Sequence, residues 1–340
     1  MLSALLDPLG DPRWAQLVAE SPQASIFHHP AWLELLHRRY RYPLAAAVVL
    51  DGAGQPMAGL PMALVSSRLT GRRLVCLPFS DVCPPLVTGD NSEALELLAE
   101  TVERERRTRD IPLHVRAPFP QLEPPVDRYL RHLVELGEGA EATEAHFASS
   151  ARRHVRKAER LGVEIEHRSD GDALEIFYAL HLYTRRRLGV PTQPKAFIRD
   201  LAGLFNRGLG FVAVARFEQR PIAAAVFLRS GGTLTYKYGA SDQRHLHARP
   251  NNLLFARVIR WGCEHGLQTL DLGRTDPGQE GLAAFKRSWG ATEETLAYTY
   301  RGTRPPPASS HLERAAGAVI RRTPPAVGRA MGELLYRHTG

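Results

Sequence analysis

Two periodicities of hydrophobic and polar residues in the second half of the chain predict its elements. Apolar residues at helical spacing predict helices over 149–162, 172–188, 195–206, 250–266 and 278–288. Alternating or short apolar runs predict strands over 163–167, 210–217, 221–229, 233–240, 268–272 and 293–300. The helix over 250–266 is a crossover, so the strands on either side of it are expected to be parallel neighbours. The pattern predicts an α/β fold, a mixed sheet of the α+β kind flanked by helices.

The first half shows a weaker version of the same order. Helical patterns lie near 12–19, 30–40 and 92–107, and strand patterns lie at 44–50, 57–67, 73–79 and 112–116. We interpret this as a duplicated fold with two tandem domains. The predicted domains are 1–142, a degenerate first copy, 143–302, the complete second copy, and 303–340, a basic helical tail.

Composition places the chain among globular proteins and excludes several classes. Of its 340 residues 44% are hydrophobic and 24% charged, which is typical of a folded domain. The three cysteines form no C-x-x-C motif, so neither a disulfide framework nor a metal site is expected. The longest uncharged stretch, 52–67, contains two prolines and is too short to span a bilayer. The N-terminus has no basic leader, so we expect a cytoplasmic protein.

The formal net charge of +8 is concentrated in two places. Residues 152–160 carry five basic residues and one glutamate, and the tail from 303 carries six arginines and two glutamates. Such surfaces favour RNA, phosphorylated substrates or acidic lipid. A non-catalytic RNA- or membrane-binding module is therefore one alternative. For residues 310–340, the alternatives are peripheral contact with the inner membrane face and packing on the first domain.

Several chemical motifs are missing, which excludes further classes. No phosphate-binding P-loop, G-x-G-x-x-G, H-E-x-x-H or G-x-S-x-G motif occurs, so kinases, simple dehydrogenases, zinc proteases and serine hydrolases are disfavoured. Other strings stand in a characteristic order: Arg152-Arg-His-Val-Arg-Lys-Ala-Glu-Arg-Leu-Gly162, Tyr236-Lys-Tyr-Gly-Ala-Ser-Asp242, Leu270-Asp-Leu-Gly-Arg274 and Gly281-Leu-Ala-Ala-Phe-Lys-Arg-Ser-Trp-Gly290. With this strand order, the chain resembles the GNAT acyltransferase superfamily, in particular the duplicated branch of Fem-type (FemAB-like) aminoacyltransferases and BioF-like acetyltransferases.

The resemblance implies transfer of an acyl or aminoacyl group onto an amine of a cell-envelope precursor, of peptidoglycan or polysaccharide type. It implies an acyl donor, either aminoacyl-tRNA or acyl-CoA, and no tightly bound cofactor. The catalytic Phe-Lys pair of the family corresponds to Phe285 and Lys286. A fixed cation there would stabilise the oxyanion formed when an amine attacks an ester. Among substrate-binding residues the resemblance points to Tyr238 and, in the basic cluster ending the helix over 172–188, to Arg187.

Other residues complete the expected site. Tyr236 and Tyr238 alternate with Lys237 on a strand, so both are expected on one face. Asp271 is a candidate for the base that deprotonates the amine, with Asp276 as an alternative. The remaining expected substrate-binding residues are Ser241, Arg274 and Arg156. The two neighbouring strands that end near Tyr238 and Asp271 are expected to diverge, and the transfer to occur between them.

One segment departs from the family pattern. Acetyl-CoA-dependent members hold the pyrophosphate in a [QR]-x-x-G-x-[GA] loop, whose small residues let backbone amides approach the anion. The matching segment here runs from Arg244 to Arg249 and has bulky basic side chains at the small positions. We therefore expect donor binding through side chains, those of Arg244, His247, Arg249 and Asn251. An acetyl-CoA-dependent N-acetyltransferase remains the alternative. The long helical arm of some Fem-type proteins has no counterpart, which weighs against aminoacyl-tRNA as donor.

Overall fold

The computed structural model describes residues 1–305 and 311–338. It divides into two compact units, described here one at a time. The first comprises Met1–Tyr129, Thr295–Pro307 and Tyr336–Gly340, and the second comprises Leu130–Glu294 and Ala308–Leu335. The two compact units part at Tyr129, because the end of strand β7 (Val126–Glu135) pairs with a strand of the second unit. As limits of the duplicated copies, 1–142, 143–302 and 303–340 remain a prediction.

The first unit is built around a mixed sheet. Its strand order is β1-β2-β3-β4-β6, followed by the end of β13 (Thr292–Arg301), and β5 pairs with β3. Strands β4 and β6 pair in parallel, whereas β1 with β2, β2 with β3, β3 with β4, β3 with β5 and β6 with β13 pair antiparallel. The strands are β1 (Leu2–Leu6), β2 (Leu44–Leu50), β3 (Pro56–Ser67), β4 (Gly71–Val75), β5 (Leu86–Val87) and β6 (Leu113–Val115), and the helices are α1 (Pro12–Glu20), α2 (Pro30–Tyr40) and α3 (Ser92–Arg109).

The second unit contains a sheet with the order β7-β12-β11-β10-β9-β8. Its strands are β8 (Glu164–Arg168), β9 (Gly210–Phe217), β10 (Arg220–Ser230), β11 (Thr233–Ser241) and β12 (Thr269–Thr275). Its helices are α4 (Ala140–Ala145), α5 (Ser149–Arg160), α6 (Gly171–Leu188), α7 (Lys195–Asp200), α8 (Ala202–Phe205), α9 (Pro250–Glu264), α10 (Glu280–Arg287), α11 (His311–Arg322) and α12 (Pro325–Leu335), besides the 3-10 helix η1 (Gln243–Ala248). The single helix expected over 195–206 is thus two short helices.

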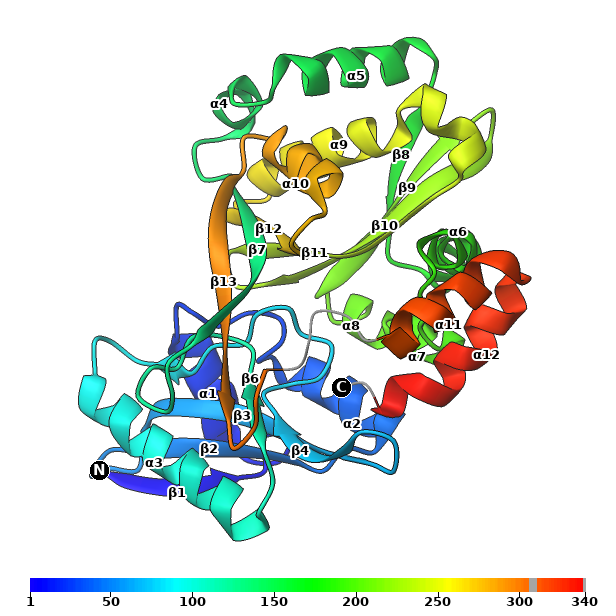
Figure 1. Ribbon diagram of the computed structural model, residues 1–340. Helices are drawn as coiled ribbons and strands as arrows, with labels where there is room; N and C mark the ends of the chain where they lie inside the picture. Colours follow the sequence, from blue (N-terminus) through cyan, green and yellow to red (C-terminus); the bar gives the residue numbers. More distant parts are fainter. Residues whose placement is uncertain (306–310, 339–340) are drawn as a thin grey trace. The chain divides into compact units, whose positions relative to one another are not determined.

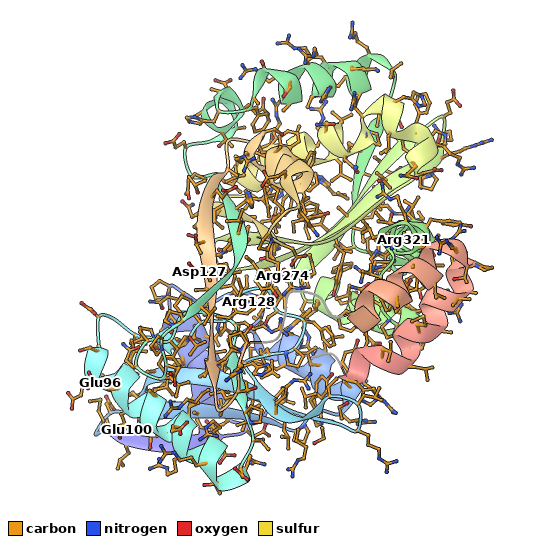
Figure 2. The ribbon with its side chains drawn as sticks, in the orientation of Figure 1. Glu96, Glu100, Asp127, Arg128, Arg274 and Arg321 are labelled. Carbon is orange, nitrogen blue, oxygen red and sulfur yellow. The ribbon has the colours of Figure 1, made fainter. Side chains whose placement is uncertain are left out.

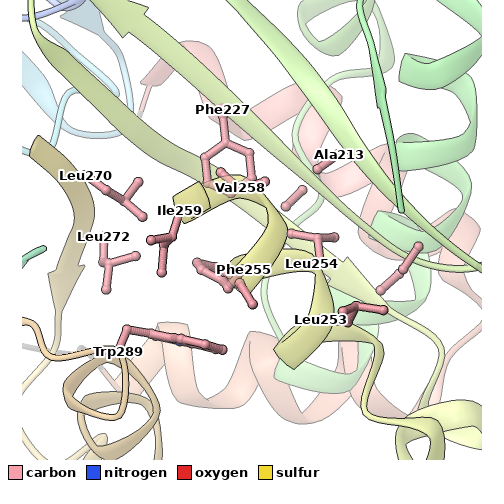
Figure 3. Packing of buried hydrophobic residues seen from close by; sticks show 14 of the residues in the cluster. Ala213, Phe227, Leu253, Leu254, Phe255, Val258, Ile259, Leu270, Leu272 and Trp289 are labelled. Atoms are coloured by element: carbon pink, nitrogen blue, oxygen red, sulfur yellow. The ribbon is translucent and has the colours of Figure 1, made fainter. Parts of the chain in front are cut away.

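Helices cover both faces of the second unit's sheet, which confirms the predicted fold class. In Figure 1, α9 and α5 lie on one face and α6 lies on the other. The apolar side of α9 forms the core on its face, where Phe255 and Ile259 pack beside Trp289 (Figure 3). The strands β9, β10 and β11 form the expected antiparallel meander, and β11 and β12 pair in parallel as predicted.

The C-terminal helices α11 and α12 pack on α6 within the second unit. The packing uses glycines that allow two backbones to touch. A Cβ atom at Gly332 would lie 1.7 Å from the carbonyl oxygen of Thr192, and one at Gly317 would lie 2.8 Å from that of Gly189. The amide of Thr192 also donates to the carbonyl of Gly328 at 3.0 Å. These two helices are therefore held against the loop between α6 and α7. The 3-10 helix η2 (Tyr336–His338) that follows them belongs to the first unit, where the hydroxyl of Tyr42 donates to the carbonyl of Arg337 at 3.0 Å.

Candidate active site

The strands β11 and β12 separate after a short parallel ladder. Their pairs are Thr233 with Thr269, Leu234 with Leu270 and Thr235 with Asp271. Among the described residues no further ladder pair joins them, although β11 continues to Ser241 and β12 to Thr275. The last part of β12 pairs with β7 alone. The expected divergence of these two strands is thus present.

A β-bulge in each strand accompanies this separation. In β11 the pairing with β10 shifts so that Lys237 is an extra residue, because Val226 pairs with Tyr238 and Phe227 with Tyr236. In β12 the pairing with β7 shifts between Asp271 and Arg274, where Gly273 has φ of +70°. A bulge bends and twists the strand that carries it. Two facing bulges therefore account for the divergence of the strands.

Lys286 extends from α10 to the diverging end of β12. Its ammonium donates to the carbonyl oxygen of Gly273 at 2.7 Å and to that of Arg274 at 3.0 Å, and the residue is only 3% exposed. These carbonyls belong to the part of β12 that no longer pairs with β11. The lysine thus donates to two backbone carbonyls at this end of β12, and it places a positive charge beside the gap in the ladder.

Asp271 stands at the last residue pair before the strands part. One carboxylate oxygen accepts from the Nε and an Nη of Arg131 at 3.0 and 2.8 Å, and the other accepts from the amide of Gly273 at 2.8 Å. Arg131 also donates to Glu294 at 3.0 Å. Both oxygens of Asp271 are therefore engaged, and the carboxylate holds the bulge of β12. Its role as the base remains a prediction.

The prediction that Tyr236 and Tyr238 share a face is wrong. Because the bulge at Lys237 adds one residue between them, the two tyrosines lie on opposite faces of the sheet. Tyr236 packs against Phe255 of α9, with ring centroids 5.0 Å apart. Tyr238 packs near His181 of α6, at 6.0 Å. The bulge is defined by the pairing with β10 and is not visible in the sequence of β11 alone.

Tyr236 lies on the same face as the Phe285–Lys286 pair. Phe285 contacts Phe255, the aromatic neighbour of Tyr236, at a centroid distance of 5.3 Å. Burial raises the pKa of Tyr236 to about 12, so its hydroxyl keeps its proton at neutral pH. The absence of a side chain at Gly239 makes room for that hydroxyl, since a Cβ there would lie 2.0 Å from it. Tyr236, Phe285 and Lys286 thus belong to one region of the second unit.

On the opposite face, Tyr238 and Ser241 are arranged by α6. The hydroxyl of Thr184 accepts from the amide of Ser241 at 3.1 Å. His181 stacks on Phe177 at 4.9 Å, and its Nε2 is 2.6 Å from the amide oxygen of Gln193. Burial lowers the pKa of His181 to about 3, so its imidazole is neutral. Sequence reasoning missed His181, which is recognisable only as one more residue on the apolar side of its helix.

The expected donor-binding residues lie around η1 and the start of α9. Asp242 caps η1 by accepting from the amide of Arg244 at 3.0 Å and from its guanidinium at 2.7 Å. His247 and Arg249 are exposed, and Arg249 has a left-handed backbone with φ of +56°. Asn251 is half-buried in the first turn of α9. The segment is therefore a short helix with basic side chains, and its role in donor binding remains a prediction.

The expected substrate-binding arginines are dispersed over the second unit. Arg274 lies at the end of β12 beside Lys286 (Figure 2). Arg187 is exposed in the last turn of α6, and Arg156 is exposed on α5, which packs on α9. Since α6 and α9 cover opposite faces, the structure does not bring Arg187 and Arg156 together. Their binding roles remain predictions.

A buried imidazole next to Lys286 was also missed by sequence reasoning. Nε2 of His132 is 2.9 Å from a carboxylate oxygen of Glu293, and its Nδ1 is 3.5 Å from the hydroxyl of Thr275. Burial lowers the pKa of His132, and the charge of Lys286 adds to this effect. The neutral imidazole therefore adds no second positive charge beside the ammonium. His132 lies on β7, outside the strings that pointed to the site, which is why no motif revealed it.

The described residues contain neither a candidate metal site nor a candidate membrane-spanning helix. No three histidine, cysteine, aspartate or glutamate side chains among them gather in a way that would hold a metal ion. Within the same part of the chain, no helix combines the length and the apolar character that crossing a bilayer requires.

Comparison with known sequences identifies the type of domain. Residues 145–287 match the family described as acetyltransferase (GNAT) domain. A stretch of 75 residues is 33% identical to lipid II:glycine glycyltransferase of Staphylococcus haemolyticus, and a stretch of the same length is 35% identical to that of Staphylococcus epidermidis. Each stretch covers 20% of this chain and 18% of the relative. The matched part is thus less than a fifth of the length of those relatives.

Comparison with solved structures extends the similarity over most of the chain. FemX has a TM-score of 0.69 at 15% identity, covering 87% of this chain and 96% of FemX. L-PGS from Bacillus licheniformis has a TM-score of 0.55 at 13% identity, covering 93% and 97%. A tandem GNAT protein from the clavulanic acid pathway has a TM-score of 0.54 at 13% identity, covering 90% and 99%. At these identities, the comparisons establish a shared fold.

Proposed function

Since residues 145–287 match the acetyltransferase (GNAT) domain family and 75 residues resemble lipid II:glycine glycyltransferases, we propose that the protein transfers an acyl or aminoacyl group to an amine of a cell-envelope precursor. The observation that carries the proposal is the ladder of β11 and β12, which stops after three pairs where Lys286 binds the carbonyls of Gly273 and Arg274. The relatives named lipid II:glycine glycyltransferase support a lipid-linked acceptor of this chemical type.

In the proposed reaction, the nitrogen of the acceptor attacks the carbonyl carbon of the donor ester or thioester. The carbonyl oxygen gains negative charge and the nitrogen loses a proton, after which the intermediate collapses and the alcohol or thiol leaves. The ammonium of Lys286 supplies positive potential where that oxygen forms, an effect worth about 3 kcal/mol in a site from which water is excluded. It also fixes the end of β12 through its two backbone hydrogen bonds.

The remaining residues position the reacting groups. Asp271 and Arg131 hold the bulge that directs Gly273 and Arg274 away from β11. Tyr236 retains its phenolic proton and can donate a hydrogen bond on the α9 face. Tyr238 and Ser241 lie toward the other face, on the α6 side, where we place the acceptor.

The two candidate donors are distinguished by direct assay. Acetyl-CoA and glycyl-tRNA are each incubated with the protein and an amine acceptor, and release of thiol or of deacylated tRNA is followed. Turnover with one donor, reduced in Lys286→Met and retained in Lys195→Met, supports the transfer reaction with that donor. Absence of turnover with both donors, over a panel of envelope-precursor peptides, contradicts the proposal.

A second candidate function is that of an acetyl-CoA-dependent N-acetyltransferase that acts on another amine. Two observations favour it: the description of the matching domain family and the N-terminus of α9. The N-cap residue Arg249 makes no side-chain capping bond there, and the positive end of a helix favours an anion such as a phosphate of CoA. Calorimetry with CoA tests this candidate directly. Micromolar binding of CoA that is weakened in Arg244→Gln supports this candidate. Absence of CoA binding favours aminoacyl-tRNA as the donor.

Peripheral membrane contact through the tail is a separate part of the proposal. Val319 and Leu334 are 52% and 68% exposed, and arginines accompany them on α11 and α12. Sedimentation with vesicles containing phosphatidylglycerol tests this contact in the full chain. Retention that is lost in the double variant Val319→Ser, Leu334→Ser supports it, and equal sedimentation of variant and wild type contradicts it.

A further inference from the structure

His132 connects three strands of the second unit at the diverging end of β12. It lies on β7 and is fully buried. Its Nε2 is 2.9 Å from a carboxylate oxygen of Glu293 on β13, and its Nδ1 is 3.5 Å from the hydroxyl of Thr275, the last residue of β12. Thr275 directly follows Arg274, whose carbonyl oxygen accepts from the ammonium of Lys286 at 3.0 Å. The imidazole therefore contacts the segment of backbone that holds the ammonium.

Glu293 fixes which ring nitrogen of His132 carries the hydrogen. Arg287 donates to the same carboxylate oxygen at 2.7 Å and lowers the pKa of Glu293, so the carboxylate is ionised and can only accept. The hydrogen of the neutral imidazole is thus on Nε2, and Nδ1 is left as an acceptor. The hydroxyl of Thr275 is buried, and within the described part of the chain Nδ1 is its one hydrogen-bond partner. The hydrogen bonds therefore run from Thr275 through His132 to Glu293.

A proton on Nδ1 breaks this chain of hydrogen bonds. His132 faces the cations Lys286 and Arg287 of α10, the carboxylate of Glu293 and the hydroxyl of Thr275. Burial, together with the charge of Lys286, lowers the pKa of His132 from its usual value of 6.5, so the ring is neutral at neutral pH. Protonation at lower pH removes the acceptor of the Thr275 hydroxyl and adds a second positive charge beside Lys286.

We propose that His132 is a positioning residue of the transfer site, whose neutral imidazole, oriented by Glu293, holds the Thr275 end of β12 in the arrangement that Lys286 requires. This role rests on the proposed function, because it concerns the same strand end. It also makes turnover depend on pH, since acidification releases the hydroxyl of Thr275. His132 acts through Thr275 and the backbone of β12, and a displacement of about 1 Å in such a site can lower turnover about a hundredfold.

Two amide replacements separate the functions of the two ring nitrogens. In His132→Asn the amide oxygen can take the place of Nδ1 and accept from Thr275, whereas in His132→Gln the amide nitrogen can take the place of Nε2 and donate to Glu293. Both kcat and KM are measured between pH 5.0 and 8.0 with the active donor. We expect His132→Gln to lower kcat tenfold or more with little change in KM, and His132→Asn to retain most of the activity.

The pH profile distinguishes this role from a merely structural one. The ratio of the kcat of a variant to that of wild type cancels the titration of the amine substrate. We expect this ratio to rise for His132→Asn as the pH falls below 6.5, because only wild type loses the acceptor of Thr275. Thr275→Val keeps the shape of the side chain without the hydroxyl. It should lose as much kcat as His132→Gln, and the double variant should lose no more.

His146→Gln is the matched control, since it removes an exposed histidine of the same unit and should keep the wild-type rates and pH profile. Melting temperatures establish that each variant folds, and Thr275→Val carries the test if the His132 variants do not. Wild-type kcat and pH profile in both His132→Gln and Thr275→Val overturn the positioning role and leave the transfer reaction in place. Losses that are additive and equal at every pH also overturn it. If wild type has no turnover with either donor, the proposed function fails and the positioning role fails with it.

A measurement on the wild-type ring is independent of turnover. Nitrogen-15 chemical shifts of the histidine side chains, assigned with His132→Gln or His132→Asn, report which ring nitrogen carries the hydrogen and at what pH the ring titrates. We expect the hydrogen of His132 on Nε2, and titration below pH 6.5 that moves to higher pH in Lys286→Met. A ring that is charged at pH 7, or that carries its hydrogen on Nδ1, overturns the inference even when wild type is active.

Discussion

The two units differ at the place where two neighbouring parallel strands pair and then end, which we call the junction of each unit. In the first unit the parallel strands β4 and β6 pair at Leu74 with Leu113 and at Val75 with His114. The chain beyond β4 then returns to this junction, and the amide of Cys83 donates to the carbonyl of Arg116 at 3.0 Å. In the second unit the matching strands β11 and β12 part after three pairs, and a side chain, that of Lys286, binds the carbonyls at the end of β12.

This difference indicates why the chemistry is assigned to the second unit. Backbone that pairs with backbone closes the junction of the first unit and leaves no strand end for a substrate. A lysine side chain in the second unit satisfies the same kind of carbonyl and adds charge. Under the proposed function, the transfer site lies in the second unit and the first unit has a structural role.

The largest expected effect is a decrease in the free energy of unfolding as the pH falls, and its size should differ between the two units. Burial lowers the pKa of His28 to about 4 in the first unit and that of His181 to about 3 in the second. The unfolded chain binds these protons near pH 6.5 and the folded chain only at lower pH. Each histidine's contribution to the free energy of unfolding is therefore complete above pH 6.5. It is lost as the pH falls toward the pKa of the folded state, and the loss is roughly 3 kcal/mol or more.

Urea unfolding at pH 7.0, 5.5 and 4.5 measures this loss. Tryptophan fluorescence can separate the units, because Trp14 and Trp32 lie in the first and Trp261 and Trp289 in the second. The variant His146→Gln removes an exposed histidine and serves as the control, with an unchanged pH profile expected. A free energy of unfolding that stays constant between pH 7.0 and 4.5 would contradict the assignment of neutral buried histidines.

The second largest expected effect is that of replacing Lys286 on the rate of the reaction proposed for the second unit. We expect Lys286→Met to lower turnover at least tenfold, since the variant loses both the positive potential and the two hydrogen bonds to β12. Steady-state rates with the active donor measure the effect. Lys195→Met, which breaks a surface ion pair with Glu175 and a cation–π contact with Tyr178, should retain wild-type rates. Equal rates for Lys286→Met and wild type would remove Lys286 from the mechanism.

The order of strands and helices from α5 to β13 was predictable from the sequence, because those elements carry their own period and turn residues. Strands β1 and β7 were not predicted. The Phe285–Lys286 pair was predicted from the sequence because its string resembles that of a family, and its catalytic role stays a prediction. The bulge at Lys237 was not predictable, because it depends on which residues of β10 face β11. Arg131 and His132 were missed for a similar reason, as they reach the site from β7, far along the chain.

The end of the first unit's β4 shows the same limitation. The apolar run from Arg73 to Phe79 predicts one strand, but β4 ends at Val75. Leu77 and Phe79 have φ values of +47° and +62°, a left-handed conformation that a strand cannot continue. Contacts that close the junction of the first unit impose this conformation on residues whose own preference is extended. A local pattern therefore cannot distinguish the two junctions.

We expect a smaller effect on the free energy of unfolding from a substitution in α12, where this helix packs in the second unit. Gly332→Ala would place a methyl group 1.7 Å from the carbonyl oxygen of Thr192, so α12 must shift away from the loop between α6 and α7. We expect a loss of about 1–3 kcal/mol in the free energy of unfolding, typical of overpacking. Gly203→Ala, in α8, meets no atom within 4 Å and should be neutral or slightly stabilising. Equal melting temperatures for the two variants would contradict this docking.

The most direct test of the central claim is hydrogen–deuterium exchange on the full chain with and without donor analogues. A non-hydrolysable acetyl-CoA analogue and a stable aminoacyl-tRNA analogue are each added in excess. We predict slower exchange at 236–241 and 272–275, the diverging ends of β11 and β12, with one of the two analogues and unchanged exchange at 76–83 and 114–117. Protection at the junction of the first unit instead, or at neither junction with both analogues, would contradict the account.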